Sequence, residues 1–209
     1  MATTNVMNYS EIDVNAIQFA NNPRALSSGM KMVDLVIDNK PIIFQTSKLV
    51  APWGVSTQYK QTDKFELTLL PTKDLKEFLH SFETKVISYM FSNQEILGVA
   101  NKTKEMIQDK LSSCLKSDNY GSIKIVPKLD QNTLIFNSDN NKVESPSIGW
   151  FADGEPTVTK RSKNYVLLQM PSVWVTTGRF GISLKVKQIQ SFPQMENKIS
   201  EFALVPMDE

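Results

Sequence analysis

The hydrophobic pattern in the first third of the chain is typical of short β-strands. Residues 1–29 are rich in Asn and Ser and show weak periodicity, so we interpret them as an N-terminal arm. Phe65, Leu67 and Leu69 alternate with polar residues, which indicates a half-buried strand. Further β-prone runs, punctuated by Pro and Gly, lie at 30–37, 42–45 and 48–53.

The pattern changes from strand-like to helical after Pro71. Thr72 stands where an N-cap is expected, and Asp74 adds negative charge to the first turn. Apolar residues at spacings of three and four then predict an amphipathic helix of about five turns. These residues are Leu75, Phe78, Leu79, Phe82, Val86, Tyr89 and Met90. A second, shorter helix is predicted over 103–115, with a stripe of Met106, Ile107, Leu111 and Leu115.

The remaining hydrophobic runs are again β-prone, so strands are predicted after the helices as well. The turn-forming composition of 137–147 predicts a mobile excursion between two of them. The predicted strands lie near 123–126, 133–136, 148–151, 165–169, 172–176 and 181–190.

The order of these elements predicts the fold class. Strands come first, then helices, then strands again, without the alternation that a doubly wound parallel sheet requires. We therefore predict a mainly β fold with a helical insert, built as an antiparallel barrel or sandwich. The predicted organisation is an arm at 1–29, one domain at 30–195 with its helical insert at about 72–115, and a tail at 196–209.

Size and composition are those of an ordinary globular domain. The 209 residues are 41% hydrophobic and 22% charged. No apolar run approaches the roughly 20 residues that cross a bilayer, and the first residues lack the apolar core of a secretion signal. We therefore expect neither a membrane span nor secretion. Cys114 is the only cysteine, which fits a reducing compartment.

Charge is segregated along the chain. Residues 156–195 contain six basic residues and no Asp or Glu, whereas the whole chain carries 23 basic and 22 acidic residues. Tyr165, Trp174, Phe180 and Phe192 stand among these cations. Cations for phosphates and flat rings for unstacked bases are what a single-stranded nucleic acid requires. A solvated basic face with its aromatic residues in the core is the competing interpretation.

The segment 172–176 and the residues after it predict a strand pair with one basic face. If Val173 and Val175 point inward, Trp174 points outward. Lys185 and Lys187 would share one face of the next strand, and Arg179 would lie on a Gly-bracketed hairpin turn. An outward Trp beside lysines would stack bases next to phosphate contacts. A core position for Trp174 remains the alternative, because Trp is usually largely buried.

Three segments resemble the OB-fold single-stranded-DNA-binding proteins of large nucleocytoplasmic DNA viruses. They are LVAPWGV at 49–55, SIGWF at 147–151, and VWV at 173–175 followed by RFGISLKVKQ at 179–188. The resemblance implies an OB-like, five-stranded Greek-key barrel with added strands and a helix between its third and fourth strands. It also implies a groove that follows a DNA strand and no catalytic residues. The chain departs from the simplest pattern in having extra strands and a weakly acidic tail.

The chain offers little for catalysis or metal binding. His80 is the only histidine and lies beside the apolar stripe of the long helix, so we expect an exposed or boundary position. One His and one Cys do not make a zinc site of the usual type. There is no phosphate-binding loop or dinucleotide fingerprint. A Mg²⁺-binding carboxylate pair is left open by the 22 acidic residues, although the basic stretch contributes none of them.

We therefore predict a non-enzymatic, sequence-tolerant protein that binds single-stranded DNA in viral replication, repair or recombination, without cofactor or metal. The predicted phosphate contacts are Lys160, Arg161, Lys163, Arg179, Lys185 and Lys187. The predicted stacking residues are Trp174, Phe180, Trp53, Trp150 and Tyr165.

Two other functions remain open from the sequence. A virion structural or assembly protein would also suit a β-rich domain with an Asn-rich arm, and an RNA-binding module differs mainly in its contacts to the 2′-hydroxyl. Homo-oligomerisation and replication proteins are left open as partners, and no membrane partner is expected. The expected location is the host cytoplasm or the viral factory, with packaging in the virion left open.

Overall fold

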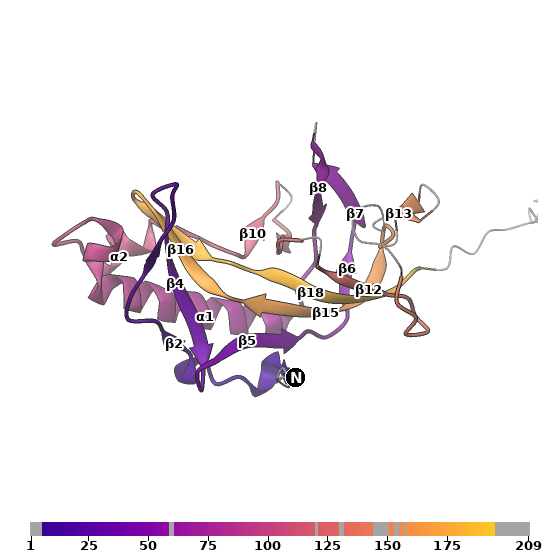
Figure 1. Cartoon of the computed structure of the whole chain (residues 1–209), viewed down its shortest axis with the longest axis horizontal. Coiled ribbons are helices and arrows are strands. Elements are labelled where there is room, and N and C mark those ends of the chain that lie inside the picture. Colours follow the sequence, from indigo (N-terminus) through magenta and orange to yellow (C-terminus); the bar gives the residue numbers. More distant parts are fainter. Residues whose placement is uncertain are drawn as a thin grey trace, which may run out of the picture.

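The computed structural model describes residues 6–58, 61–119, 121–129, 132–143, 151–152, 155–156 and 158–194. Their main feature is a large mixed sheet with one long helix, α1 (Lys73–Ser92), packed along it (Figure 1). The sheet runs in the order β12 (Leu134–Phe136), β18 (Lys185–Phe192), β15 (Ser162–Met170), β5 (Lys40–Gln45), β4 (Lys31–Ile37), β16 (Ser172–Thr176), β17 (Arg179–Ile182) and β9 (Leu111–Ser112).

Shorter elements extend this sheet or stand beside it. Four strands pair outside the main path: β1 (Met7–Asn8), β2 (Gln18–Phe19), β3 (Arg24–Ala25) and β6 (Leu49–Ala51). Three separate two-stranded pairs are β7 (Val55–Gln58) with β8 (Gln61–Leu67), β10 (Lys116–Ser117) with β11 (Ile123–Lys124), and β13 (Phe151–Ala152) with β14 (Glu155–Pro156). The remaining helical elements are η1 (Tyr9–Glu11), η2 (Val14–Ala16), η3 (Gln94–Leu97) and α2 (Lys104–Gln108).

The predicted fold class, mainly β with a helical insert, is confirmed. Most strand pairs are antiparallel, but β12 with β18, β17 with β9 and β1 with β5 are parallel, so the sheet is mixed. The described strands are not closed into a barrel by continuous ladders. Isolated bridges instead connect Leu69 to Ile125, Glu66 to Lys128 and Lys128 to Lys185. The segment around Lys128 thus lies beside the start of β18.

The long helix forms where the apolar periodicity predicts it. Thr72 caps it, with its hydroxyl oxygen accepting from the Leu75 N–H at 3.4 Å. The apolar stripe is buried against the sheet, and the Phe78 ring meets the Phe44 ring of β5 edge-on at 5.5 Å. The fully buried members of the stripe are Leu75, Leu79, Phe82, Val86 and Met90.

The predicted second helix is shorter than its hydrophobic pattern suggests. Helix α2 ends at Gln108 and a turn follows at 109–110. Leu111 and Ser112 are then extended, because they pair in parallel with β17. Of the predicted stripe, Ile107 is buried but Met106 is 45% exposed. Pairing with a strand that is distant in sequence has overridden the local preference for helix.

Part of the N-terminal segment, from Tyr9 to Phe19, packs against the rest of the fold. Tyr9, Ile12 and Ile17 are buried in the common core. The Phe19 ring stacks on Tyr89 of α1 at 4.0 Å. The Lys85 amine on α1 donates to the carbonyl oxygens of residues 14 and 15, at 2.8 and 2.7 Å. The domain boundaries stay predictions, although the described part of the predicted arm contributes to the core.

Other predictions fall outside the described residues. These are the first four residues of the SIGWF motif, the end of the 137–147 excursion and the tail at 196–209. Within the described ranges, no helix is both long and apolar enough to span a bilayer.

The turn after β6 requires a glycine at position 54 of the LVAPWGV motif, and a substitution there tests this requirement. Gly54 has φ +70°, and a Cβ there would lie 2.4 Å from the Val158 carbonyl oxygen. We expect Gly54→Ala to lower the free energy of unfolding by about 3 kcal/mol. Two costs add up in this variant: the strain of a left-handed backbone at a residue with a Cβ, and the steric clash of that Cβ with Val158. Urea denaturation measures this loss.

Gly29→Ala is the matched control for backbone strain without a clash. Gly29 has φ +79°, and a Cβ at this position would have no atom within 4 Å. In Gly29→Ala the free energy of unfolding should fall by only about 1 kcal/mol. Equal losses in the two variants would contradict the steric explanation for Gly54.

Candidate nucleic-acid interface

The hairpin of β16 and β17 presents Trp174 as its alternation predicts. Its turn is the two-residue loop Thr177-Gly178, with Gly178 at φ +81°. Val173 and Val175 are buried, whereas Trp174 is half-buried on the other side of the strand. The outward orientation of Trp174 is therefore confirmed, and the core alternative for it is wrong.

The position of the Trp174 indole depends on the glycine opposite it. Trp174 and Gly181 are cross-strand partners, and a Cβ on Gly181 would lie 2.7 Å from the indole ring. The same Cβ would lie 2.7 Å from the Ser112 carbonyl oxygen. Gly181 therefore leaves space for the indole to lie against the backbone of β17.

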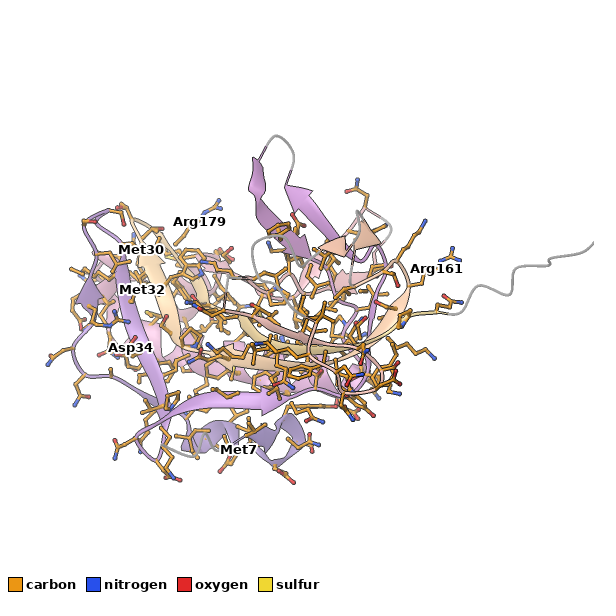
Figure 2. The ribbon with its side chains drawn as sticks, turned by 45° about the vertical axis from the view of Figure 1, so that its right-hand side comes forward. Met7, Met30, Met32, Asp34, Arg161 and Arg179 are labelled. Atoms are coloured by element: carbon orange, nitrogen blue, oxygen red, sulfur yellow. The ribbon has the colours of Figure 1, made fainter. Side chains whose placement is uncertain are left out.

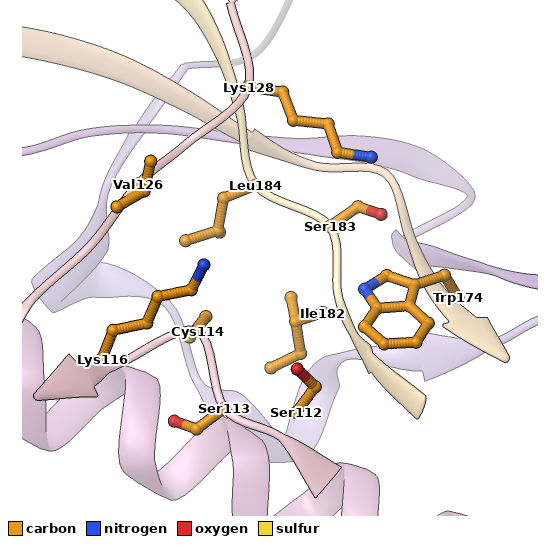
Figure 3. A pocket seen from close by; sticks show the side chains of 10 residues that line it. All are labelled: Ser112, Ser113, Cys114, Lys116, Val126, Lys128, Trp174, Ile182, Ser183 and Leu184. Carbon is orange, nitrogen blue, oxygen red and sulfur yellow. The ribbon is translucent and has the colours of Figure 1, made fainter. Parts of the chain in front are cut away.

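A hollow of about 140 Å³ lies beside Trp174 and contains two lysines (Figure 3). We call it the Trp174 hollow; Ser112, Ser113, Cys114, Lys116, Val126, Lys128, Trp174, Ile182, Ser183 and Leu184 line it. Lys116 and Lys128 come from separate segments and reach into the same opening (Figure 3). The arrangement joins a half-exposed aromatic ring to two positive charges in a space large enough for a phosphate group.

A buried carboxylate on α1 holds one wall of this hollow. Glu83 is only 4% exposed, and its Oε1 accepts from the Ser113 hydroxyl and the Cys114 N–H, both at 2.7 Å. Ser113 Oγ in turn accepts from the Leu115 N–H at 3.0 Å. Burial, and secondarily the Glu83 carboxylate, raises the pKa of the Cys114 thiol, so this cysteine stays a neutral structural residue.

The prediction that Lys185 and Lys187 share one regular strand with Ile182 is wrong. Strand β17 ends at Ile182 and β18 begins at Lys185, because the chain crosses from one end of the sheet path to the other. A bulge opposite Leu167 and Leu168 then interrupts the register of β18 at Lys187. Both lysines are half-buried. The backbone of Lys185 forms a β-bridge with that of Lys128, at the rim of the Trp174 hollow.

The surface of β15 and β18 opposite their buried side chains forms a second aromatic and basic region, which we call the open face. On β15, Lys163 is exposed and Tyr165 is half-buried. The Lys48 amine lies 5.2 Å from the centre of the Tyr165 ring and 4.1 Å from that of Phe192. The two rings meet edge-on at 5.9 Å.

A second hollow, of about 350 Å³, lies on the open face. We call it the glutamine hollow, and it is lined by Gln45, Tyr165, Val166, Leu167, Gln188 and Gln190. Strand register brings these residues together, since Leu167 lies between Gln45 of β5 and Gln188 of β18.

Trp53 marks a third region, at the turn after β6. It is 54% exposed, and the Lys124 amine lies 5.3 Å from its ring centre. The Arg161 N–H donates to the Ala51 carbonyl at 2.7 Å, which places Lys160 and Arg161 near this turn. Figure 2 shows Arg161 at the right and Arg179 well apart from it at the upper left, so these two predicted cations do not belong to one cluster.

The lysines beside the aromatic rings, Lys48, Lys116, Lys124 and Lys128, form no ion pair with a carboxylate in the described part of the chain. The ion pairs found there are Arg24 with Asp34 and Lys73 with Glu77. Arg24 lies near Trp174, since both pair across strands with Met32. Its guanidinium donates to both Asp34 oxygens, at 2.7 and 2.6 Å, and this hydrogen bonding lowers the pKa of the Asp34 carboxyl. Arg24 is therefore already neutralised, unlike the lysines around the hollows.

The predicted stacking set needs one correction. Phe180 is fully buried, because it pairs with Val175 on the core side of the hairpin and therefore has no face open to a base. Trp150 lies outside the described residues. Trp174, Tyr165 and Trp53 are accessible as described above.

Sequence reasoning missed several residues that the fold adds to these regions. They are Lys48, Lys116, Lys124, Lys128 and the glutamines of the open face. Each lies outside the acid-free stretch or is uncharged, so charge segregation could not find it. Phe192 was visible as one of the aromatic residues of that stretch, but its pairing with Lys48 was not.

No metal centre is formed by the described residues: no group of three or more His, Cys, Asp and Glu side chains is placed to hold an ion. His80 is exposed on α1. The arrangement defines a β-rich domain in which the rings of Trp53, Tyr165 and Trp174 each stand beside cations that form no ion pair in the described part of the chain.

Comparison with known proteins adds a likeness of fold. No family model matches the chain, and no curated protein matches it either. Among solved structures, it is similar to the single-stranded DNA-binding protein from bacteriophage Enc34, at 14% identity over 88% of this chain and 93% of that one, with a TM-score of 0.41.

Two further structures show a comparable likeness. The Enc34 protein in complex with single-stranded DNA shares 15% identity over 86% of this chain and 94% of that chain, with a TM-score of 0.43. The single-stranded DNA-binding protein gp2.5 of bacteriophage T7 shares 14% identity over 78% of this chain and 98% of its own, with a TM-score of 0.45. The likeness concerns the fold and assigns no role to any residue.

The contacts of Glu83 lead to a stability prediction. Glu83→Leu leaves the buried Cys114 N–H without an acceptor and removes one of the two acceptors of the Ser113 hydroxyl, so we expect the free energy of unfolding to fall by about 2 kcal/mol. Glu83→Gln keeps a side-chain oxygen that can accept these hydrogen bonds, so its free energy of unfolding should fall by less. Urea denaturation compares both variants with Glu77→Leu, an exposed position on the same helix whose change should stay within about 0.5 kcal/mol. A loss in Glu83→Leu no larger than in Glu77→Leu would contradict the structural role.

Proposed function

We propose that this protein is a non-enzymatic, sequence-tolerant single-stranded-DNA-binding protein. The observation that carries the proposal is the repeated pairing of an accessible ring with a cation. Trp174 stands beside Lys116 and Lys128, Tyr165 beside Lys48, and Trp53 beside Lys124.

This pairing matches the chemistry of an unpaired strand. Each nucleotide offers one phosphate, which a cation neutralises, and one base with two flat faces, which an aromatic ring stacks. Such contacts do not depend on base identity, because every base has a π-face. Within the ranges described, none of these cations forms an ion pair with a carboxylate, which leaves their charges available to phosphates.

The finer parts of the proposal rest on the sequence motifs. The resemblance to proteins of large nucleocytoplasmic DNA viruses supports a role in viral DNA replication, repair or recombination. It also supports action in the host cytoplasm or viral factory, with the virion as a further site. Replication proteins and a second copy of the chain are the partners such a role suggests.

The first test is binding of a labelled dT oligonucleotide, followed by fluorescence anisotropy, with a duplex of equal length as control. We expect preference for the single strand, and Trp174→Ala should weaken binding by about tenfold through lost stacking. Phe91→Ala is the matched control, because Phe91 is 40% exposed near the end of α1 and lines neither hollow. Absence of dT binding at low salt would refute the proposal, and tighter binding of an RNA strand would reassign the ligand.

The second test concerns Lys185 and Lys187, which are predicted to contact phosphates. Replacing both with Glu should weaken dT binding strongly. The log–log salt slope should become less steep by about 1.4, since each single-strand contact contributes about 0.7. Lys40→Glu with Lys73→Glu is the control, since both residues are exposed on other surfaces. An unchanged affinity and slope in a folded variant would remove these two lysines from the site.

A further inference from the structure

The glutamine hollow has features that phosphate binding does not require. Its lining contains three amide side chains and no acidic or basic residue. At about 350 Å³ it is more than twice the size of the Trp174 hollow and lies within the range of about 300–1,000 Å³ that is usual for small-molecule sites. Its surface can therefore take a group larger than a phosphate.

The amides are available for new hydrogen bonds. Within the described ranges, the side chains of Gln45 and Gln188 make no hydrogen bond to the protein, although each lies against the hollow. Gln190 is oriented, because its Nε2 donates to Asn140 Oδ1 at 2.6 Å. That hydrogen bond also fixes the orientation of Gln190 Oε1, which accepts no hydrogen bond from the described residues. Each amide thus offers a donor or an acceptor at a position fixed by the strands.

An aromatic and cationic wall borders the hollow. Tyr165 lines it directly and stands opposite Gln190 across the strands. Lys48 lies over the Tyr165 and Phe192 rings, 5.2 and 4.1 Å from their centres, and brings a positive charge to the edge of the site. The neighbouring Lys163 is exposed on the same face. A group that is flat, polar at its edge and attached to an anion complements this set.

We propose that the glutamine hollow binds one unpaired nucleobase of the DNA strand, with Gln45 and Gln188 hydrogen-bonding its edge. Lys48 then contacts the adjoining phosphate, and Tyr165 contacts the face of the base. The proposal rests on the proposed function and adds to it a subsite that contacts base edges without selecting one base, because a Gln amide carries both a donor and an acceptor. An amide that both donates and accepts matches the adjacent donor and acceptor of a base edge, as in known Gln contacts to adenine.

The experiment compares the double variant Gln45→Leu/Gln188→Leu with the wild type. Anisotropy titrations use dA and dT oligonucleotides and a strand of equal length built from abasic deoxyribose-phosphate units. Gln18→Leu/Gln108→Leu is the matched control, because both glutamines are exposed on β2 and α2, outside the hollow. Melting temperatures establish that all variants are folded.

We expect the double variant to bind the base-bearing strands about tenfold more weakly, since two hydrogen bonds are lost. Its affinity for the abasic strand should change by less than about twofold, because phosphate contacts do not involve these amides. The control variant should match the wild type on all three strands.

Two results would overturn the subsite while leaving the proposed function intact. Equal weakening on abasic and base-bearing strands would assign the amides to the sugar-phosphate backbone. Unchanged binding of every strand would place the hollow outside the DNA contact and favour a polypeptide occupant. Failure of the wild type to bind any single strand would instead refute the proposed function itself, and the subsite with it.

Discussion

Burial of one face of the central strands under α1 is the constraint on which the rest of the structure depends. Side chains alternate along a strand, so once Val166, Leu168 and Ile189 face the core, their neighbours must face outward. Lys163 and Tyr165 therefore come to the open face together with Gln188. A slip of one residue in this register would bury charges and expose the core, so the same packing that stabilises the fold defines its polar surface.

Contacts between distant segments then complete the surface. The Glu83 carboxylate holds residues 113 and 114 beside β17, and the bridge from Lys128 to Lys185 brings another cation to the rim of the same hollow. Gly181 keeps space for the Trp174 indole. The result is a series of rings and unpaired cations spread along the described part of the molecule, an arrangement suited to an extended polyanion rather than to one compact ligand.

Much of the fold could be predicted from local pattern. The long helix has its cap at Thr72 and its buried stripe as predicted, because α1 has strong periodicity and a clear N-cap signal. The second helix was overestimated, because Leu111 and Ser112 gain more by pairing with β17 than by continuing a helix. Phe180 was wrongly assigned to stacking, since its burial follows from pairing opposite Val175 on the core side.

The sequence by itself determined the mainly β class and the concentration of cations in residues 156–195, since these follow from periodicity and composition. The alternation of residues 172–176 left two orientations open for Trp174, and the burial of Val173 and Val175 in the core decided between them. Only the tertiary structure decided which lysines accompany each ring. Lys48, Lys116, Lys124 and Lys128 reach the candidate interface through strand register and isolated bridges. The physical reason is that helix and strand preferences are local, whereas these contacts join residues far apart in the chain and are formed only when the core is packed.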